Sequence, residues 1–151
     1  MKILDILDPR AIKVPLAAGG KREIIRELVD LLADHALVND PDELDRVVWE
    51  REQQRTTGIG EGLAIPHGKS NTTDQLVMAI GKPAEPVDFA SADSKPVRLI
   101  VLLASPPQRT ADHIQALGRI SRLMSDAAFR TRMYQAESAE AMHQLLVEAD
   151  A

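Results

Sequence analysis

The sequence predicts a single α/β domain over residues 1–151, in which helices pack on a sheet that is at least partly antiparallel. Helical apolar periodicity occupies the first and last thirds of the chain, and short apolar runs lie between them. The segment from Gln75 to Ala104 leaves no room for a crossover helix, so its strands must be joined as hairpins, which are antiparallel. No composition shift or internal repeat indicates a second domain.

Two helices are expected before the sheet. From Lys21 to Leu37 apolar residues recur at helical spacing and form one face. A second helix is expected from Pro41 to about Arg55, because Asp40 can cap it, proline suits the first helical position and Glu43 completes a capping box. The apolar face of the first helix consists of Ile24, Ile25, Leu28, Leu31 and Leu32.

The middle of the chain contains the expected strands. Gln75 to Ile80 and Val97 to Ala104 are rich in Val, Leu and Ile and are bounded by Gly, Pro and Ser. The second run is apolar at nearly every position, which predicts a central strand covered on both faces. Pro86 to Ala90, with prolines around it, indicates a short edge strand.

Three helices are expected after the sheet. Thr110 is a suitable cap for the first of them, and Ser125 and Ser138 are suitable caps for the other two.

Aromatic residues make up only 3 % of the chain, so the core must consist of aliphatic and methionine side chains.

Composition argues against several classes of protein. The formal net charge is −5, no block of Lys and Arg occurs and aromatics are few, so the chain lacks the features of a nucleic-acid-binding protein. The absence of cysteine excludes disulfides and thiolate metal sites and fits a reducing compartment. The apolar run Leu99 to Ala104 is far shorter than the ~20 residues that span a bilayer. A cytoplasmic protein without membrane insertion or a nucleic-acid partner is therefore expected.

The stretch from Thr56 to Ser70, TTGIGEGLAIPHGKS, is the most distinctive part of the sequence. It does not fit a Walker A loop, because the first glycine of that motif would fall on Leu63. Its first three glycines alternate, which does not match the dinucleotide pattern either. Alternating glycines can simply permit turns, or they can let the backbone approach a ligand or partner closely. Pro66 restricts the chain just before His67, which would hold that imidazole at the end of a rigid segment.

The four histidines differ in their surroundings. His35 and His143 lie in expected helices with no chemical partners nearby, so structural or incidental roles are favoured for both. His67 and His113 lie at the edges of expected elements, next to a glycine or close to a helix cap, and are the functional candidates.

Three roles remain open for this pair of histidines at the level of residue chemistry. They can bind a metal together with Asp112 or Glu61, although no metal-binding spacing occurs. They can act as a general base for Ser70 or Thr57, although no nucleophile elbow is present. A neutral imidazole can also itself attack phosphorus.

A histidine nucleophile needs donors for the phosphoryl oxygens. His113, three residues after Thr110, would combine an imidazole with the free amides of a helix N-terminus. Arg51 precedes the glycine stretch, but charged neighbours favour a solvated helix face for it when residue chemistry alone is considered. These neighbours are Glu50, Glu52 and Arg55.

The segment from Thr57 to Gly68 closely resembles the active-site signature of enzyme IIA domains of the mannitol/fructose class of the bacterial phosphotransferase system. The resemblance extends from Leu4 through the final helix. The length and the lack of a transporter segment resemble the nitrogen-regulatory branch, EIIA-Ntr. One departure is the sequence ASPPQ from Ala104 to Gln108, where relatives often have Val-Pro. It lies just before His113, where it can alter docking but not the chemistry.

The resemblance implies a mixed sheet of about five strands flanked by helices on both faces. It implies that His67 accepts a phosphoryl group from an HPr-like phosphocarrier of the NPr type. His113 and Arg51 would stabilise that group, which overturns the solvated-face interpretation of Arg51. Transfer between two histidines would require no cofactor and no metal. The phosphorylation state would regulate target proteins such as transporters or sensor kinases.

Two alternatives to this function remain. A sugar-specific enzyme IIA would pass the phosphoryl group from His67 to the IIB domain of a permease. A binding module would keep the fold without phosphotransfer, although the presence of His67, His113 and Arg51 argues against it.

Overall fold

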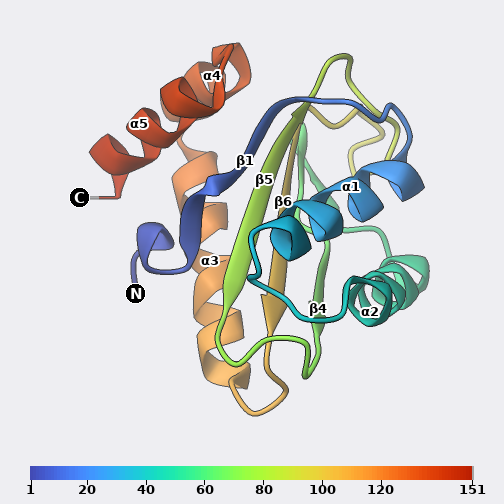
Figure 1. The fold of residues 1–151 in the computed structure, drawn as a ribbon. Helices are drawn as coiled ribbons and strands as arrows, with labels where there is room; N and C mark the ends of the chain where they lie inside the picture. Colours follow the sequence, from blue (N-terminus) through green and yellow to red (C-terminus); the bar gives the residue numbers. More distant parts are fainter. Residues whose placement is uncertain (151) are drawn as a thin grey trace.

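The computed structural model describes residues 1–150 as a six-stranded mixed sheet with helices on both faces (Figure 1). The strands are β1 (Leu7–Leu16), β2 (Gly58–Gly60), β3 (Leu63–Ala64), β4 (His67–Lys69), β5 (Val77–Pro83) and β6 (Leu99–Ser105). Their order is β1-β5-β6-β3-β2, and β4 also pairs with β6. This architecture confirms the predicted α/β class with a mixed sheet.

The helices are η1 (Ile3–Asp5), α1 (Lys21–Asp34), α2 (Pro41–Gln54), α3 (Thr110–Ser125), α4 (Ala127–Gln135) and α5 (Ala139–Ala149). Helices α1 and α2 lie on one face of the sheet, and α3 to α5 lie on the other (Figure 1). Within residues 1–150 no helix combines the length and the apolar character needed to cross a membrane.

The two predicted strands form the centre of the sheet. β5 and β6 are antiparallel, with Ile80 opposite Val101, as the short connection between them requires. Every residue of β6 is buried, which confirms the prediction of a central strand covered on both faces. The predicted edge strand at Pro86 to Ala90 is reduced to one antiparallel bridge between Val87 and Val97.

Strand β1 was not predicted, so the expected order of helices, then strands, then helices is wrong at its start. The segment contains Pro9, Pro15 and charged residues, and these obscure the alternation that identifies a strand. It pairs in parallel with β5 and its register shifts twice. An edge strand needs only one hydrogen-bonded neighbour, and for that reason it tolerates both prolines.

The cap of α2 is confirmed, but its capping box is not formed. The Asp40 carboxylate accepts a hydrogen bond of 3.1 Å from the Glu43 amide. The Glu43 carboxylate instead accepts hydrogen bonds from Arg46, one turn further along the helix. The exposed Arg46 thus binds the Glu43 carboxylate, which in a capping box would accept from the backbone amide of Asp40.

Two of the three caps predicted for the C-terminal helices are wrong. Arg109 precedes α3 without a side-chain cap, and Thr110 is the first helical residue. Asp126, and not Ser125, caps α4 through its carboxylate, which accepts from two backbone amides. Ser138 caps α5 as predicted and accepts from the Ala141 amide at 3.1 Å.

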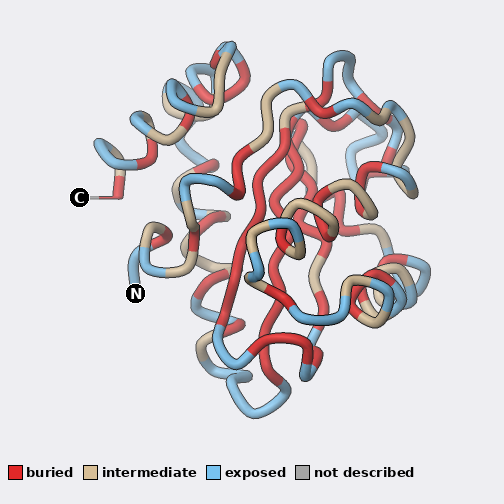
Figure 2. The backbone as a smooth tube through the Cα atoms, in the orientation of Figure 1, coloured by how far each residue is buried: buried red, intermediate tan, exposed pale blue. Residues whose placement is uncertain are grey.

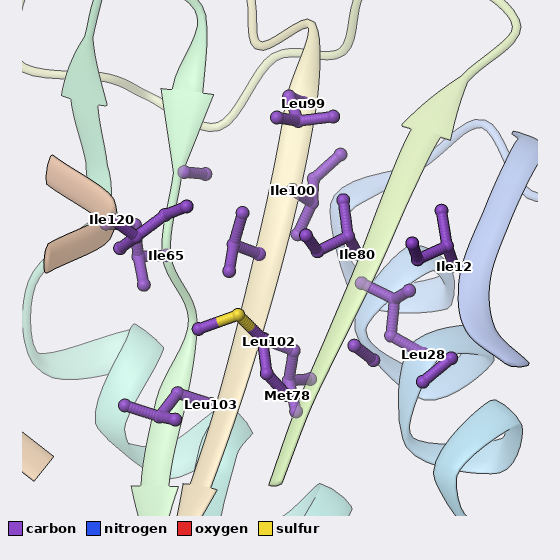
Figure 3. Packing of buried hydrophobic residues seen from close by; sticks show 14 of the residues in the cluster. Ile12, Leu28, Ile65, Met78, Ile80, Leu99, Ile100, Leu102, Leu103 and Ile120 are labelled. Carbon is purple, nitrogen blue, oxygen red and sulfur yellow. The ribbon is translucent and has the colours of Figure 1, made fainter. Parts of the chain in front are cut away.

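The core is aliphatic, as the composition predicts. Figure 2 shows the buried residues along β5 and β6 and on the inner sides of the helices. Figure 3 shows Ile120 of α3 beside Ile65 on one side of β6, whereas Ile12 and Leu28 lie toward β1 and α1 on the other. Phe89 is the largest of the fully buried side chains. These layers support β6, and the candidate site lies along its side.

Candidate functional site

His67 begins β4, which is separated from β3 by a short break in the pairing with β6. β3 and β4 both run parallel to β6 along the same side, where Ala64 pairs with Ile100 and His67 with Leu103. Between them lies the pair Ile65 and Pro66, and a proline has no N–H to donate to a ladder. The break in the ladder leaves the carbonyl of Ile65 free of β6.

The Ile65 carbonyl determines which nitrogen of His67 carries a proton. His67 Nδ1 lies 2.7 Å from this oxygen. A carbonyl only accepts, so Nδ1 carries the hydrogen and donates it, and the neutral ring keeps its lone pair on Nε2. The imidazole is half-buried, and burial, followed by the charges of Arg51 and Lys69, lowers its pKa against the effect of the Ile65 hydrogen bond and Glu52. His67 is therefore neutral and nucleophilic at pH 7.

The structure brings His113 next to His67. The two ring centroids are 5.2 Å apart and the ring planes are inclined by 63°. His113 lies in the first turn of α3 and is 5 % exposed, and its Nδ1 lies 2.5 Å from Ser105 Oγ. Burial, with smaller contributions from the charges of His67 and Lys69, lowers the pKa of His113 to about 4. This ring is also neutral at physiological pH.

The N-terminus of α3 lies beside the imidazole of His113, and the helix begins at Thr110. The amide of His113 already donates to the Arg109 carbonyl at 3.0 Å, so it is not available to a ligand. The Thr110 hydroxyl accepts from Lys69 Nζ at 3.1 Å. Lys69 therefore adds a side-chain donor beside the N-terminus of α3.

All three predicted site residues line one hollow of about 420 Å³, which we call the histidine cavity. Its lining consists of Val47, Arg51, His67, Gly68, Lys69, His113 and Leu117. Arg51 uses one guanidinium nitrogen to donate to the Arg55 carbonyl at 3.1 Å, and its other N–H groups remain for a ligand. One nucleophilic imidazole thus shares a cavity with a second imidazole and two cations, which is the set of groups that a phosphoryl group needs.

Lys69 was missed at the level of the sequence. It follows His67 by two residues in β4, so both side chains point to the same face of the strand. The signal that would have found it is strand alternation within the sequence HGK, but the glycines made that segment resemble a loop.

A second hollow of about 430 Å³ adjoins the histidine cavity and shares Arg51, His67 and Leu117 with it. Ile59 lies on its lining and is 53 % exposed, and Ile114, next to His113, is 63 % exposed. We call these two isoleucines the apolar rim. Large apolar side chains exposed around a polar site are typical of a protein-docking surface.

The start of the glycine stretch is held by a buried carboxylate. Glu52 is 3 % exposed and accepts from the Thr57 amide at 2.8 Å and from the Thr57 hydroxyl. Its charge is balanced by Lys21, 2.9 Å away. The interpretation of Glu52 as part of a solvated face was therefore wrong, although its neighbour Arg51 does face the site.

The glycine stretch continues into a tight turn between β2 and β3. Gly60 and Gly62 have φ of 109° and 84°, a region that favours glycine, and Glu61 between them has φ of 56°. The Tyr134 hydroxyl donates to the Glu61 carbonyl. Burial, the largest cause, raises the pKa of Tyr134 to about 12, so the phenol keeps its proton and this hydrogen bond.

The structure does not assemble the alternative chemistries. Among residues 1–150 no cluster of three His, Cys, Asp or Glu side chains is arranged to hold a metal, and Asp112 and Glu61 pair with arginines. The Thr57 hydroxyl donates to Glu52, and Ser70 Oγ accepts from the Thr72 amide. Neither of these two hydroxyls is hydrogen-bonded to an imidazole within residues 1–150, so neither Thr57 nor Ser70 is prepared as a nucleophile.

Comparison with known proteins agrees with this geometry. A family model described as "Phosphoenolpyruvate-dependent sugar phosphotransferase system, EIIA 2" matches residues 5–149. The chain belongs to this EIIA family. It is therefore a component of the phosphotransferase class, as the resemblance of the glycine stretch implied.

Individual EIIA proteins and structures extend the comparison. The Nitrogen regulatory protein of Bradyrhizobium diazoefficiens is 34 % identical over 97 % of this EIIA chain and 95 % of that protein. The fructose-specific EIIABC component of Bacillus subtilis is 32 % identical over 99 % of this chain, which spans only 24 % of that protein. The crystal structure of IIA-Ntr from Neisseria meningitidis matches with a TM-score of 0.85 and 30 % identity, covering 94 % of this chain and 97 % of that one.

Proposed function

We propose that this EIIA chain is a phosphohistidine protein of the nitrogen-type phosphotransferase system, and that His67 receives its phosphoryl group from an HPr-like phosphocarrier of the NPr type. The hydrogen bond from His67 Nδ1 to the Ile65 carbonyl carries the proposal, because it leaves the Nε2 lone pair available. The relatives of the nitrogen-regulatory type support this branch. A cytoplasmic location and a single EIIA domain over residues 1–151 are parts of the same proposal.

The transfer is a displacement between two imidazoles. The Nε2 lone pair of His67 forms the new N–P bond while the N–P bond of the carrier breaks, and the released electron pair returns to the carrier nitrogen. Arg51 donates to the phosphoryl oxygens from its guanidinium, as does the N–H of His113. Positioning and electrostatics supply the catalysis, so the proposed transfer needs no cofactor.

Phosphorylation also changes the surface around His67. A phosphoryl group adds about two negative charges beside the apolar rim formed by Ile59 and Ile114. A partner that binds the uncharged rim would lose affinity, and one that carries cations would gain it. Regulated targets such as transporters or sensor kinases are therefore part of the proposal.

A sugar-specific role is the second candidate, and the fructose-specific relative favours it. The chemistry at His67 would be the same, and the phosphoryl group would pass on to a IIB domain. Because both functions use one nucleophile, only the recipient distinguishes them.

The first experiment is phosphorylation with phosphoenolpyruvate, enzyme I and a phosphocarrier, read by intact mass. We expect a gain of one phosphoryl group that is acid-labile and base-stable. The gain disappears in His67→Ala and persists in His143→Ala, the control for a histidine outside the site. A phosphorylated carrier that transfers nothing to the wild-type protein would refute the proposal.

The second experiment identifies the recipient. Phosphorylated protein is mixed with the IIB domain of a fructose-class permease, and the loss of phosphate from His67 is followed by mass. A stable phosphorylated form supports the regulatory function. Rapid transfer to IIB would establish the sugar-specific alternative.

A further inference from the structure

A buried serine hydroxyl lies beside the ring of His113. Ser105 is the last residue of β6, at the point where the sequence reads Ala-Ser-Pro-Pro. Its side chain is fully buried, and its Oγ lies 2.5 Å from His113 Nδ1. A valine at this position would offer the imidazole no polar partner.

The hydroxyl hydrogen of Ser105 must be donated, because a buried polar hydrogen without an acceptor is costly. Within residues 1–150 the side chain of Ser105 makes one hydrogen bond, to His113 Nδ1. If Nδ1 also carried a hydrogen, two hydrogens would face each other across this contact. Ser105 therefore donates, Nδ1 accepts, and the single proton of the neutral ring lies on Nε2.

We propose that Ser105 is a positioning residue that fixes His113 as the Nε2–H tautomer, so that this imidazole presents an N–H donor in the histidine cavity. The inference rests on the proposed function, in which His113 binds the phosphoryl group that His67 receives. It replaces the expectation that the segment from Ala104 to Gln108 affects docking but not the chemistry.

The two histidines of the cavity then have opposite tautomers for the same physical reason. A carbonyl beside Nδ1 of His67 forces that nitrogen to donate and frees a lone pair on Nε2. A hydroxyl beside Nδ1 of His113 makes that nitrogen accept and leaves a hydrogen on Nε2. One ring is prepared as the nucleophile and the other as the donor, and neither has to exchange a proton with solvent during transfer.

Protonation of His113 to an imidazolium does not explain its N–H donor. The groups that face His113 are His67 and Lys69 of β4 and Arg51 of α2, which line the same cavity. The positive charges among them oppose protonation of His113, so an imidazolium donor is disfavoured. A neutral ring donates from Nε2 only as one of its two tautomers, and the hydroxyl of Ser105 selects that tautomer.

The test compares Ser105→Thr with Ser105→Val, because the two side chains have the same shape and differ only in the hydroxyl. Long-range ¹H–¹⁵N correlation spectra of the labelled full chain at pH 7.5 report which nitrogen of each imidazole is protonated. We expect protonated Nε2 on His113 in the wild type and in Ser105→Thr, and averaged tautomers in Ser105→Val. The tautomer of His67 stays unchanged in all three proteins.

The same proteins are then assayed for phosphoryl transfer from a phosphorylated phosphocarrier under single-turnover conditions. Loss of one donor is expected to slow Ser105→Val about 2- to 10-fold relative to Ser105→Thr, the range that one hydrogen bond supplies. Ser70→Ala is the control, a buried serine whose hydroxyl accepts from the Thr72 amide and does not contact an imidazole. If the two β-branched residues unfold the chain, Ser105→Ala replaces Ser105→Val and is compared with the wild type.

The outcomes separate this inference from the proposed function. Protonated Nδ1 on wild-type His113, or a tautomer that Ser105→Val leaves unchanged, overturns the inference even if phosphotransfer proceeds. Averaged tautomers with an unchanged transfer rate overturn the positioning role. The expected tautomers in a wild-type protein that accepts no phosphoryl group support the assignment of Ser105 and refute the proposed function.

Discussion

At the scale of the residue, the reactivity of His67 depends on a balance between burial and polar contacts. The ring is half-buried, which lowers its pKa, while the Ile65 carbonyl opposes that shift by accepting from Nδ1. Arg51 and Lys69 also lower the pKa, so the cations that would hold a phosphoryl group also keep the nucleophile unprotonated. In the proposed transfer, phosphoryl binding and activation of the nucleophile thus use the same charges.

A pH dependence follows from the lowered pKa of His67. Protonation removes the Nε2 lone pair, so phosphoryl acceptance stays on its plateau down to the ordinary histidine pKa of ~6.5 and declines only below it. Lys69→Met removes one cation, raises the pKa of His67 and moves the decline to higher pH. An NMR titration of His67 in both proteins measures this directly. A decline at a higher pH in the wild type than in Lys69→Met would contradict the prediction.

At the scale of the element, the site depends on how closely α2 approaches β4. A Cβ on Gly68 would lie 2.8 Å from Val47 Cγ1 and 3.2 Å from Val48 Cγ2. The glycine therefore lets the helix that carries Arg51 lie directly on the strand that carries His67. The geometry between arginine and histidine is thus set by a residue that takes no part in the chemistry.

Substitution of Gly68 tests whether the close packing of α2 on β4 positions Arg51. Gly68→Ala is expected to displace α2, to cost about 1–3 kcal/mol of the free energy of unfolding and to slow phosphoryl acceptance roughly tenfold or more by moving Arg51. Val47→Ala in the same chain removes the nearest colliding atom and restores most of both quantities. Denaturant unfolding and single-turnover transfer are the measurements.

Gly19→Ala is the matched control for Gly68→Ala, because no atom lies within 4 Å of a Cβ at that position. It should leave both quantities unchanged. If Gly68→Ala behaves like Gly19→Ala, close helix–strand contact does not set the geometry of the site.

At the scale of the whole molecule, the two ends of the described chain are joined by one carboxylate. Asp150 follows α5, is 1 % exposed and accepts from the Leu4 amide at 3.0 Å and from Arg119 of α3 at 2.7 Å. It therefore ties α5 both to the start of the chain and to the helix that carries His113. The packing of α3 on the sheet depends in part on this distant contact.

Asp150→Asn is expected to lower the free energy of unfolding by about 1–3 kcal/mol, because it weakens charge-assisted hydrogen bonds in a buried position. Glu148→Gln is the control, since Glu148 forms an exposed ion pair with Arg132 at 3.8 Å. That change should stay within about 0.5 kcal/mol. Equal losses of stability in the two variants, measured by urea unfolding, would show that Asp150 is not a structural tie.

Local patterns in the sequence predicted the elements that depend on local physics. Apolar periodicity placed α1 and α2, the apolar run at Val97 to Ala104 placed β6, and the glycine stretch with its Pro-His ending indicated the family. The misses have a common cause. β1 is stabilised by pairing with β5 and not by its own pattern, and the cap at Asp126 competed with an equally suitable serine next to it.

The sequence by itself determined the class of fold, the aliphatic core and His67 and His113 as candidate site residues, since each depends on residue type and on spacing along the chain. Arg51 joined them only through the family resemblance. Only the tertiary structure decided which of their atoms face one another. The carbonyl beside His67, the hydroxyl beside His113, the position of Lys69 and the burial of Glu52 arise from contacts between separate elements. Tautomer and pKa depend on those neighbours in space, and linear spacing does not specify them.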